Sequence, residues 1–118
     1  MGIEGQQALR QRTKQFALRV IRLSQALPAS REAKVLGNQA LRSGTAVAAN
    51  YRAAGRARSK AEFAAKIGVV VEEADETVFW LELLVESGIV PADKLEPLLK
   101  EANELLAIFS ASRRTARG

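Results

Sequence analysis

The sequence contains no cysteine and no histidine, and these two absences exclude many kinds of functional site. Without cysteine there is no disulfide framework, no zinc–thiolate site and no thiol nucleophile. Without histidine, the commonest general base and the commonest metal ligand are missing. Catalysis would have to use carboxylate, lysine, serine or tyrosine chemistry. We therefore predict a protein that is not an enzyme, with no catalytic residue, no bound metal and no cofactor.

Long hydrophobic runs are also missing. No stretch approaches the roughly 18 uninterrupted apolar residues of a membrane-spanning helix. The first six residues lack the basic and apolar regions of a secretory signal. We expect a cytoplasmic protein that makes no membrane contact.

The composition is that of a globular protein, with 118 residues of which 47% are hydrophobic and 26% charged. This length predicts one domain spanning residues 1–118. The net charge of +5 is unevenly distributed. Residues 1–66 carry 13 lysines and arginines against three acids, whereas residues 67–118 carry five against ten. Basic and acidic helices that neutralise each other would explain this pattern, and so would a bipolar molecule that binds polyanions or copies of itself.

Hydrophobic residues recur at alternating spacings of four and three along most of the chain, which is the period of an α-helix. In the first segment the stripe is Leu9, Thr13, Phe16, Val20, Leu23 and Leu27. The pattern predicts four helices at about residues 4–27, 31–54, 60–87 and 92–112, followed by a frayed basic tail at 113–118. Short connections make such helices antiparallel, so the predicted fold is all-α, an up-down-up-down four-helix bundle.

The predicted helix ends have recognisable signals. Ser30 is a candidate N-cap of the second helix, and Ser59 with Glu62 forms a capping box at the start of the third. We expect Gly55 to end the second helix in the left-handed conformation and Gly88 to end the third.

Three residues do not fit an ordinary helix interior. Gly37 and Gly44 each cost about 1 kcal/mol relative to alanine in a helix, which indicates a tight crossing with a partner helix. Pro97 would break a continuous helix. Either it lies in the first turn of the fourth helix, or residues 91–96 form a separate, looser turn.

The third helix carries more apolar surface than one core needs. Beside its main stripe runs a second one, with Val71, Val78 and Val85 accompanied by Phe79 and Trp80. An apolar surplus of this kind predicts burial against another molecule. Self-association is the simplest candidate.

The acidic residues of the third helix are the only concentration of groups suited to acid–base or metal chemistry; they are Glu72, Glu73, Asp75, Glu76, Glu82 and Glu86. A di-metal bundle would need histidines to complete its ligand set. We instead expect one or both of Glu72 and Glu76 to accept from Arg42 in a partly buried pair that sets helix register. A metal-dependent enzyme using the two glutamates is the third alternative. Asn50, a polar residue on an apolar stripe, is expected to specify register as well.

The densest cationic region consists of Arg52, Arg56, Arg58 and Lys60, with Lys66 one turn further on. Four cations at a helix–helix turn beside a helix N-terminus can contact phosphates, although a solvated turn has the same composition. The polar face of the first helix adds Arg10, Arg12, Lys14, Arg19 and Arg22.

Four segments resemble a known family: residues 42–52 (RSGTAVAANYR), 58–63 (RSKAEF), 73–77 (EADET) and 80–84 (WLELL). They are similar to the bacterial four helix bundle protein family, the intervening-sequence proteins of large-subunit ribosomal RNA. The similarity extends from about Lys14 to Ser112.

The resemblance implies a monomer of four helices that assembles into a homopentameric ring. A related group, the accessory proteins of diversity-generating retroelements, forms basic pentameric barrels that bind nucleic acid. The resemblance thus makes Arg52, Arg56, Arg58, Lys60 and the basic face of the first helix, including Arg12 and Arg19, candidate contacts.

The sequence therefore favours a non-enzymatic oligomer that presents a basic surface to RNA or DNA. Its alternative is a structural or adaptor oligomer that binds another protein and no nucleic acid. No small-molecule substrate is indicated by either.

Overall fold

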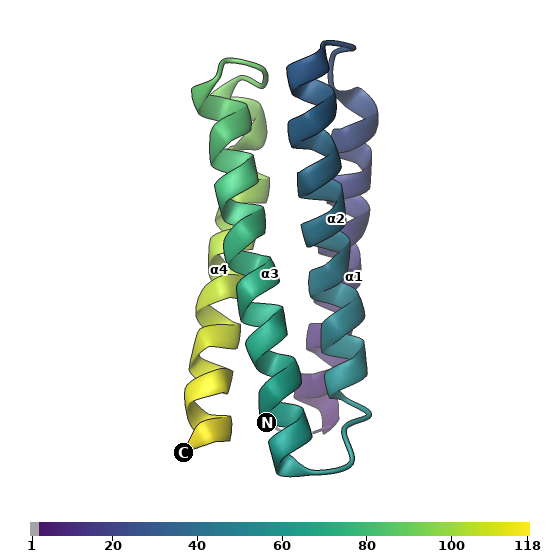
Figure 1. The fold of residues 1–118 in the computed structure, drawn as a ribbon, viewed down its shortest axis with the longest axis vertical. Helices are drawn as coiled ribbons and strands as arrows, with labels where there is room; N and C mark the ends of the chain where they lie inside the picture. Colours follow the sequence, from purple (N-terminus) through teal and green to yellow (C-terminus); the bar gives the residue numbers. More distant parts are fainter. Residues whose placement is uncertain (1–2) are drawn as a thin grey trace.

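The computed structural model describes residues 3–118 and contains four helices. They are α1 (Ile3–Ala26), α2 (Arg31–Ala54), α3 (Lys60–Glu86) and α4 (Ala92–Arg117). The described residues contain no strand. Figure 1 shows the helices running up and down in chain order, so the predicted all-α fold with four antiparallel helices is confirmed.

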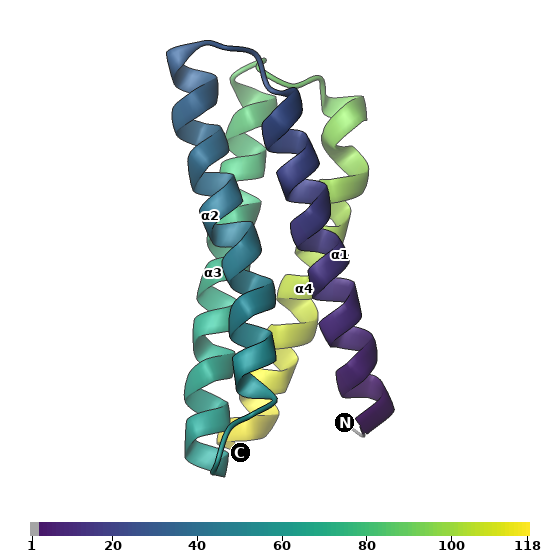
Figure 2. The same cartoon turned by 90° about the vertical axis from the view of Figure 1, so that its right-hand side faces the viewer.

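The helices form an elongated body of 45 × 22 × 20 Å in which each packs against its neighbour in the chain. The first and last helices close the bundle only loosely, because α1 contacts α4 far less than it contacts α2. In Figure 2, α1 and α4 move apart toward the end that carries the two termini. One edge of the bundle is consequently open at that end.

The core follows the predicted stripes. Its largest fully buried side chains come from all four helices and include Phe16, Val20, Val47, Ile67, Leu81, Leu84, Leu105 and Phe109. One hydrogen bond crosses this core between helices: the Thr77 hydroxyl donates to Ser43 Oγ at 2.8 Å. Because an unpaired buried hydroxyl is costly, this pair helps to fix the register of α2 against α3. Within residues 3–118, no helix is long and apolar enough to cross a membrane.

The predicted N-caps are present. The backbone amide of Ala33 donates to Ser30 Oγ, and that of Glu62 donates to Ser59 Oγ, each at 3.1 Å. The carboxylate of Glu62 reaches back one residue further than in a standard capping box, since it accepts from the amide of Arg58 at 3.2 Å.

The two helix-ending glycines differ. Gly88 follows α3 with φ of 81°, the left-handed conformation that glycine adopts without strain. The expectation for Gly55 is wrong, because its φ is −64° and its amide continues the right-handed turn by donating to Tyr51 O. The chain leaves α2 through the right-handed turn of Arg56 and Ala57, whose amides bond to Ala53 and Ala54 carbonyls.

The fourth helix corrects two expectations. It continues to Arg117 rather than ending near residue 112, so there is no frayed tail from 113 onward. Phe109 is buried and Arg113 lies across Gly68 of α3, 3.7 Å from where a β-carbon would be, which anchors the final turns. Cations at a helix C-terminus also interact favourably with the helix dipole.

Pro97 lies inside α4, in its second turn, so both predicted arrangements are wrong. A proline removes the bond to the carbonyl four residues earlier, here that of Asp93. Asp93 is exposed and stands in the first turn, where water can reach the carbonyl. Leu95 and Leu98 are buried on either side and hold the helix to the core.

Gly44 confirms the predicted tight crossing with α1, whereas Gly37 approaches Leu27 in the connection that follows α1. A β-carbon on Gly44 would lie 3.0 Å from Cγ2 of Val20, and one on Gly37 would lie 2.6 Å from Cδ1 of Leu27. Val20 is fully buried and stiff because it is β-branched, whereas Leu27 is only partly buried and has a flexible end.

We therefore expect Gly44→Ala to destabilise the fold and Gly37→Ala not to. Crowding against Val20 should cost about 1–3 kcal/mol, which exceeds the gain of about 1 kcal/mol in helix propensity. In Gly37→Ala the Leu27 side chain can move aside, so the gain in helix propensity should not be offset by crowding. Urea unfolding of both variants tests this, and equal stabilities would contradict the proposed role of Val20.

Candidate nucleic-acid interface

Four cations meet in a groove between α1 and α2. Arg10 and Lys14 stand four residues apart on α1, and Arg52 and Arg56 stand four residues apart at the end of α2. Residues four apart share one face of a helix, and the antiparallel packing of the two helices turns both faces into the same groove. Its volume is about 760 Å³, and its lining also includes Gln7, Gln11, Thr45, Ala48 and Ala49. We call it the basic groove.

The four cations are exposed, and none of them forms an ion pair within the described part of the chain. Their positive potential is therefore directed to solvent. Such a surface attracts polyanions, and the attraction weakens as salt screens it.

Arg12 does not belong to this surface, which corrects the prediction for it. Its guanidinium donates to both carboxylate oxygens of Glu101 on α4, at 2.8 and 2.7 Å, and contacts Glu104 at 3.4 Å. The hydrogen bond to Glu101 raises the pKa of Arg12. Two residues of helix rotate a side chain by about 200°, so Arg10 faces α2 while Arg12 faces α4.

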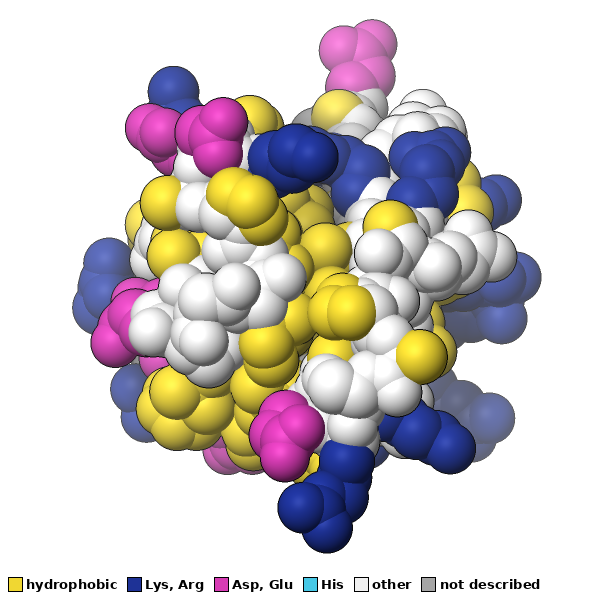
Figure 3. Space-filling model, turned by 90° about the horizontal axis from the view of Figure 1, so that it is seen from above, with side chains coloured by type: hydrophobic (Ala, Val, Ile, Leu, Met, Phe, Trp, Pro, Cys, Tyr) yellow, Lys and Arg dark blue, Asp and Glu magenta, His cyan; other side chains and the backbone are white. Residues whose placement is uncertain are grey.

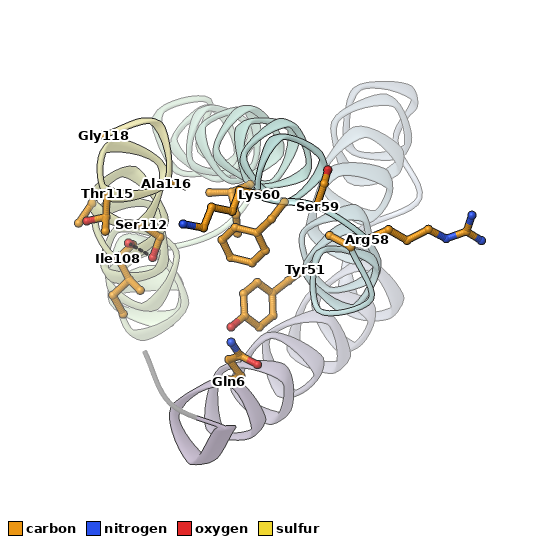
Figure 4. Close-up of a pocket in the computed structure, with 14 residues that line it drawn as sticks. Gln6, Tyr51, Arg58, Ser59, Lys60, Ile108, Ser112, Thr115, Ala116 and Gly118 are labelled. Carbon is orange, nitrogen blue, oxygen red and sulfur yellow. Dashed lines mark hydrogen bonds between the residues drawn. The ribbon is translucent and has the colours of Figure 1, made fainter.

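The other predicted contacts are only partly brought together. Arg52 and Arg56 line the basic groove, whereas Arg58 and Lys60 line a second cavity on the opposite side of the α2–α3 turn. Figure 4 shows Arg58 directed away from that cavity and Lys60 directed into it. Arg19 and Lys66 are partly buried and line neither cavity.

Arg10 and Lys14 were noted only as part of a general cationic face, and the structure gives them a specific place. A signal for them existed in the sequence. A cation pair at a spacing of four occurs in the first helix and another at the end of the second, and an antiparallel pair joined near residue 28 places position 10 opposite about position 46, within two turns of Arg52. Together, the spacing and the antiparallel topology distinguish Arg10 and Lys14, which face the second helix, from Arg12, which does not.

The charge asymmetry of the sequence is visible in three dimensions. Looking down the bundle, Figure 3 shows lysines and arginines gathered around the half formed by α1 and α2, with most acidic side chains toward α3 and α4. Ion pairs also cross between the halves, Arg12 with Glu101 and Arg42 with Glu73 and Glu76, as expected if basic and acidic helices neutralise each other in part.

The acidic cluster of α3 has a structural partner. Arg42 Nη2 donates to Glu76 at 2.6 Å, as expected, but its second carboxylate is Glu73, 3.1 Å from Nη1. Glu72 is exposed and lies near Arg113 and Arg117 instead. Residues 73 and 76 share the helix face toward α2, and residue 72 is rotated off it. Within residues 3–118, no three acidic side chains gather closely enough to hold a metal ion.

Asn50 does not specify register. Its amide donates to the carbonyl of Ala46 in its own helix at 2.9 Å, and the side chain is only partly buried. The polar contact that does cross between α2 and α3 inside the core is Ser43 with Thr77.

Comparison with known proteins identifies relatives of the whole bundle. The family described as 23S rRNA-intervening sequence protein matches residues 6–111. A crystal structure of a protein of unknown function from the S23 ribosomal protein family of Bacteroides thetaiotaomicron superimposes with a TM-score of 0.85 at 29% sequence identity. The similarity covers 92% of this chain and 97% of that one. Among curated proteins, none matches this chain.

The paired state of Arg12 predicts a stability effect. Arg12→Gln should lower the free energy of unfolding by about 1 kcal/mol, because it removes a bidentate, half-exposed ion pair, and the loss should shrink in concentrated salt. Arg31→Gln is the matched control, since Arg31 lies 3.8 Å from Glu32 and both are well exposed. Urea unfolding at low and high salt measures the free energy of unfolding of both variants. Equal losses would show that the ion pair between α1 and α4 stabilises the fold no more than an exposed pair within one helix.

Proposed function

Because this chain belongs to the 23S rRNA-intervening sequence protein family, we propose that it is a non-enzymatic, self-associating helical-bundle protein that binds RNA or DNA. The observation that carries the proposal is the basic groove. Its four exposed cations lack acidic partners within residues 3–118. Binding a phosphate chain there would release its condensed counterions, which is the main source of sequence-independent affinity for nucleic acids.

The geometry suits a phosphate backbone better than a single anion. Arg10 and Lys14 span about 6 Å along α1, and they face Arg52 in the last turn of α2 and Arg56 in the turn that follows it. The side-chain amides of Gln7 and Gln11, which also line the groove, can donate further hydrogen bonds to phosphate oxygens. Such a contact with the phosphate backbone does not depend on the base sequence.

Reversing two groove charges should remove the binding. We expect Arg52→Glu with Arg56→Glu to weaken the affinity for a nucleic acid by at least about tenfold and to flatten its dependence on salt, since each lost phosphate contact reduces the salt slope by about one. Filter binding at a series of salt concentrations measures both quantities.

The matched control reverses Arg22 and Lys34, which are exposed but do not line the groove. It changes the net charge by the same amount, so its affinity should fall much less. If both double variants lose the same affinity, the interaction follows total charge and the groove has no special role. If the unaltered protein shows no salt-dependent binding, the adaptor function becomes the better explanation.

We infer that self-association accompanies this function, with the homopentamer that the family resemblance implies. The support is apolar surface that the monomer leaves open: Val35 is 56% exposed, Phe79 50% and Val69 38%. Phe79 packs edge-on against Trp80, with ring centroids 5.1 Å apart, so it is held in place at the surface. Association would repeat the basic groove around the assembly.

Phe79→Glu should therefore shift the protein toward the monomer, because it places a charge in an apolar contact. Light scattering coupled to gel filtration reads the mass directly. Ala107→Glu is the control, as Ala107 is exposed on α4 with little apolar surface to lose. An unaltered protein that elutes with the mass of one chain would contradict self-association.

A further inference from the structure

A second, larger cavity lies beside the basic groove. It occupies about 1010 Å³ at the open end of the bundle, where α1 and α4 diverge. Tyr51, Phe63, Ile67 and Ile108 give it mainly apolar walls. We call it the apolar pocket.

Three of the polar side chains that line the pocket converge on its interior. Figure 4 shows Gln6, the Tyr51 hydroxyl and Lys60 directed toward the space between α1 and α4. The Tyr51 ring is fixed against Phe109, with centroids 5.0 Å apart, and within residues 3–118 its hydroxyl forms no hydrogen bond. Burial raises the pKa of Tyr51, so the hydroxyl is a neutral donor at physiological pH. Apolar walls with a few directed polar groups are typical of sites for small planar ligands.

The groove and the pocket lie on two sides of α1 at the same end of the bundle, and their linings contain chain neighbours although they share no residue. Gln7 and Arg56 line the groove, while their chain neighbours Gln6 and Ala57 line the pocket. Arg10, a groove residue, is near enough to Tyr51 to lower its pKa against the larger effect of burial. A chain of alternating phosphates and bases that lies in the groove and continues around this end of the bundle would reach the mouth of the pocket.

We propose that the apolar pocket receives an unpaired base of a single-stranded nucleic acid whose phosphates lie in the basic groove. This inference rests on the proposed function and narrows its ligand to single strands. In a duplex the bases are stacked and paired, so none can enter a side pocket without being extruded, whereas single-stranded bases are free to bind aromatic and apolar surfaces. Lys60 supplies a cation inside the pocket for a flanking phosphate or a base carbonyl.

Filling the pocket tests the inference. Ala111 is exposed on α4 and lines the pocket, so Ala111→Trp should occupy the space without disturbing the core. Ala107→Trp is the matched control, exposed one turn earlier on the same helix and outside the lining. The probes are a short oligouridylate, its deoxythymidylate counterpart, an abasic phosphodiester chain of equal length and a hairpin duplex.

We expect the unaltered protein to bind the oligouridylate or the deoxythymidylate at least about tenfold more tightly than the abasic chain, since stacking one base contributes roughly 1–3 kcal/mol. Ala111→Trp should abolish that preference and leave duplex affinity unchanged, while Ala107→Trp keeps it. The two oligomers differ in the 2′-hydroxyl and in the thymine methyl group, so an oligodeoxyuridylate, which lacks both, shows which of the two the site responds to.

Three outcomes overturn the proposal. Equal affinity for abasic and base-carrying chains shows that no base is bound. If Ala111→Trp and Ala107→Trp change the preference for base-carrying chains equally, the base does not bind in the apolar pocket. In both cases the groove variants still report on phosphate binding, so the proposed function can stand alone. If no probe binds at all, the proposed function itself has failed.

Discussion

The close packing of α1 on α2 determines the functional surface. Gly44 lets the α1 backbone approach until Val20 fills the space where a side chain would otherwise stand. This approach sets Arg10 and Lys14 opposite Arg52 and Arg56. Since α1 is held mainly by α2, it makes little contact with α4, and the other side of α1 is left open as the apolar pocket. One glycine contact thus underlies both cavities.

The number, order and approximate ends of the helices could be predicted, because they depend on local signals. A stripe of apolar residues at helical spacing and a serine N-cap act within a few residues, and Ser30 and Ser59 cap as expected. The end of α4 depends instead on a contact with Gly68 far away in the sequence. Pro97 was misplaced because the packing of Leu95 and Leu98 outweighs one lost backbone bond.

The candidate site was predicted less completely, because charge pairing depends on which way each side chain faces. Arg52 and Arg56 were identified from their density at a turn, but density does not distinguish Arg10 from Arg12. Only the placement of Glu101 on α4 shows that Arg12 is neutralised. An error of one helix position also explains why the sequence predicted Glu72, rather than Glu73, as a partner of Arg42. A rotation of about 100° per residue decides such pairs.

The ion pair of Arg12 with Glu101 and Glu104 is a polar link across the loose α1–α4 edge of the bundle. In the turns of α1 before it, Leu9 is buried in the core and Gln6 lines the apolar pocket, so this ion pair helps to hold the helix that forms one wall of the pocket. Ionic strength then acts at two places in the same direction. Salt that screens phosphates from the cations of the groove also weakens the ion pair that links α1 to α4 beside the pocket.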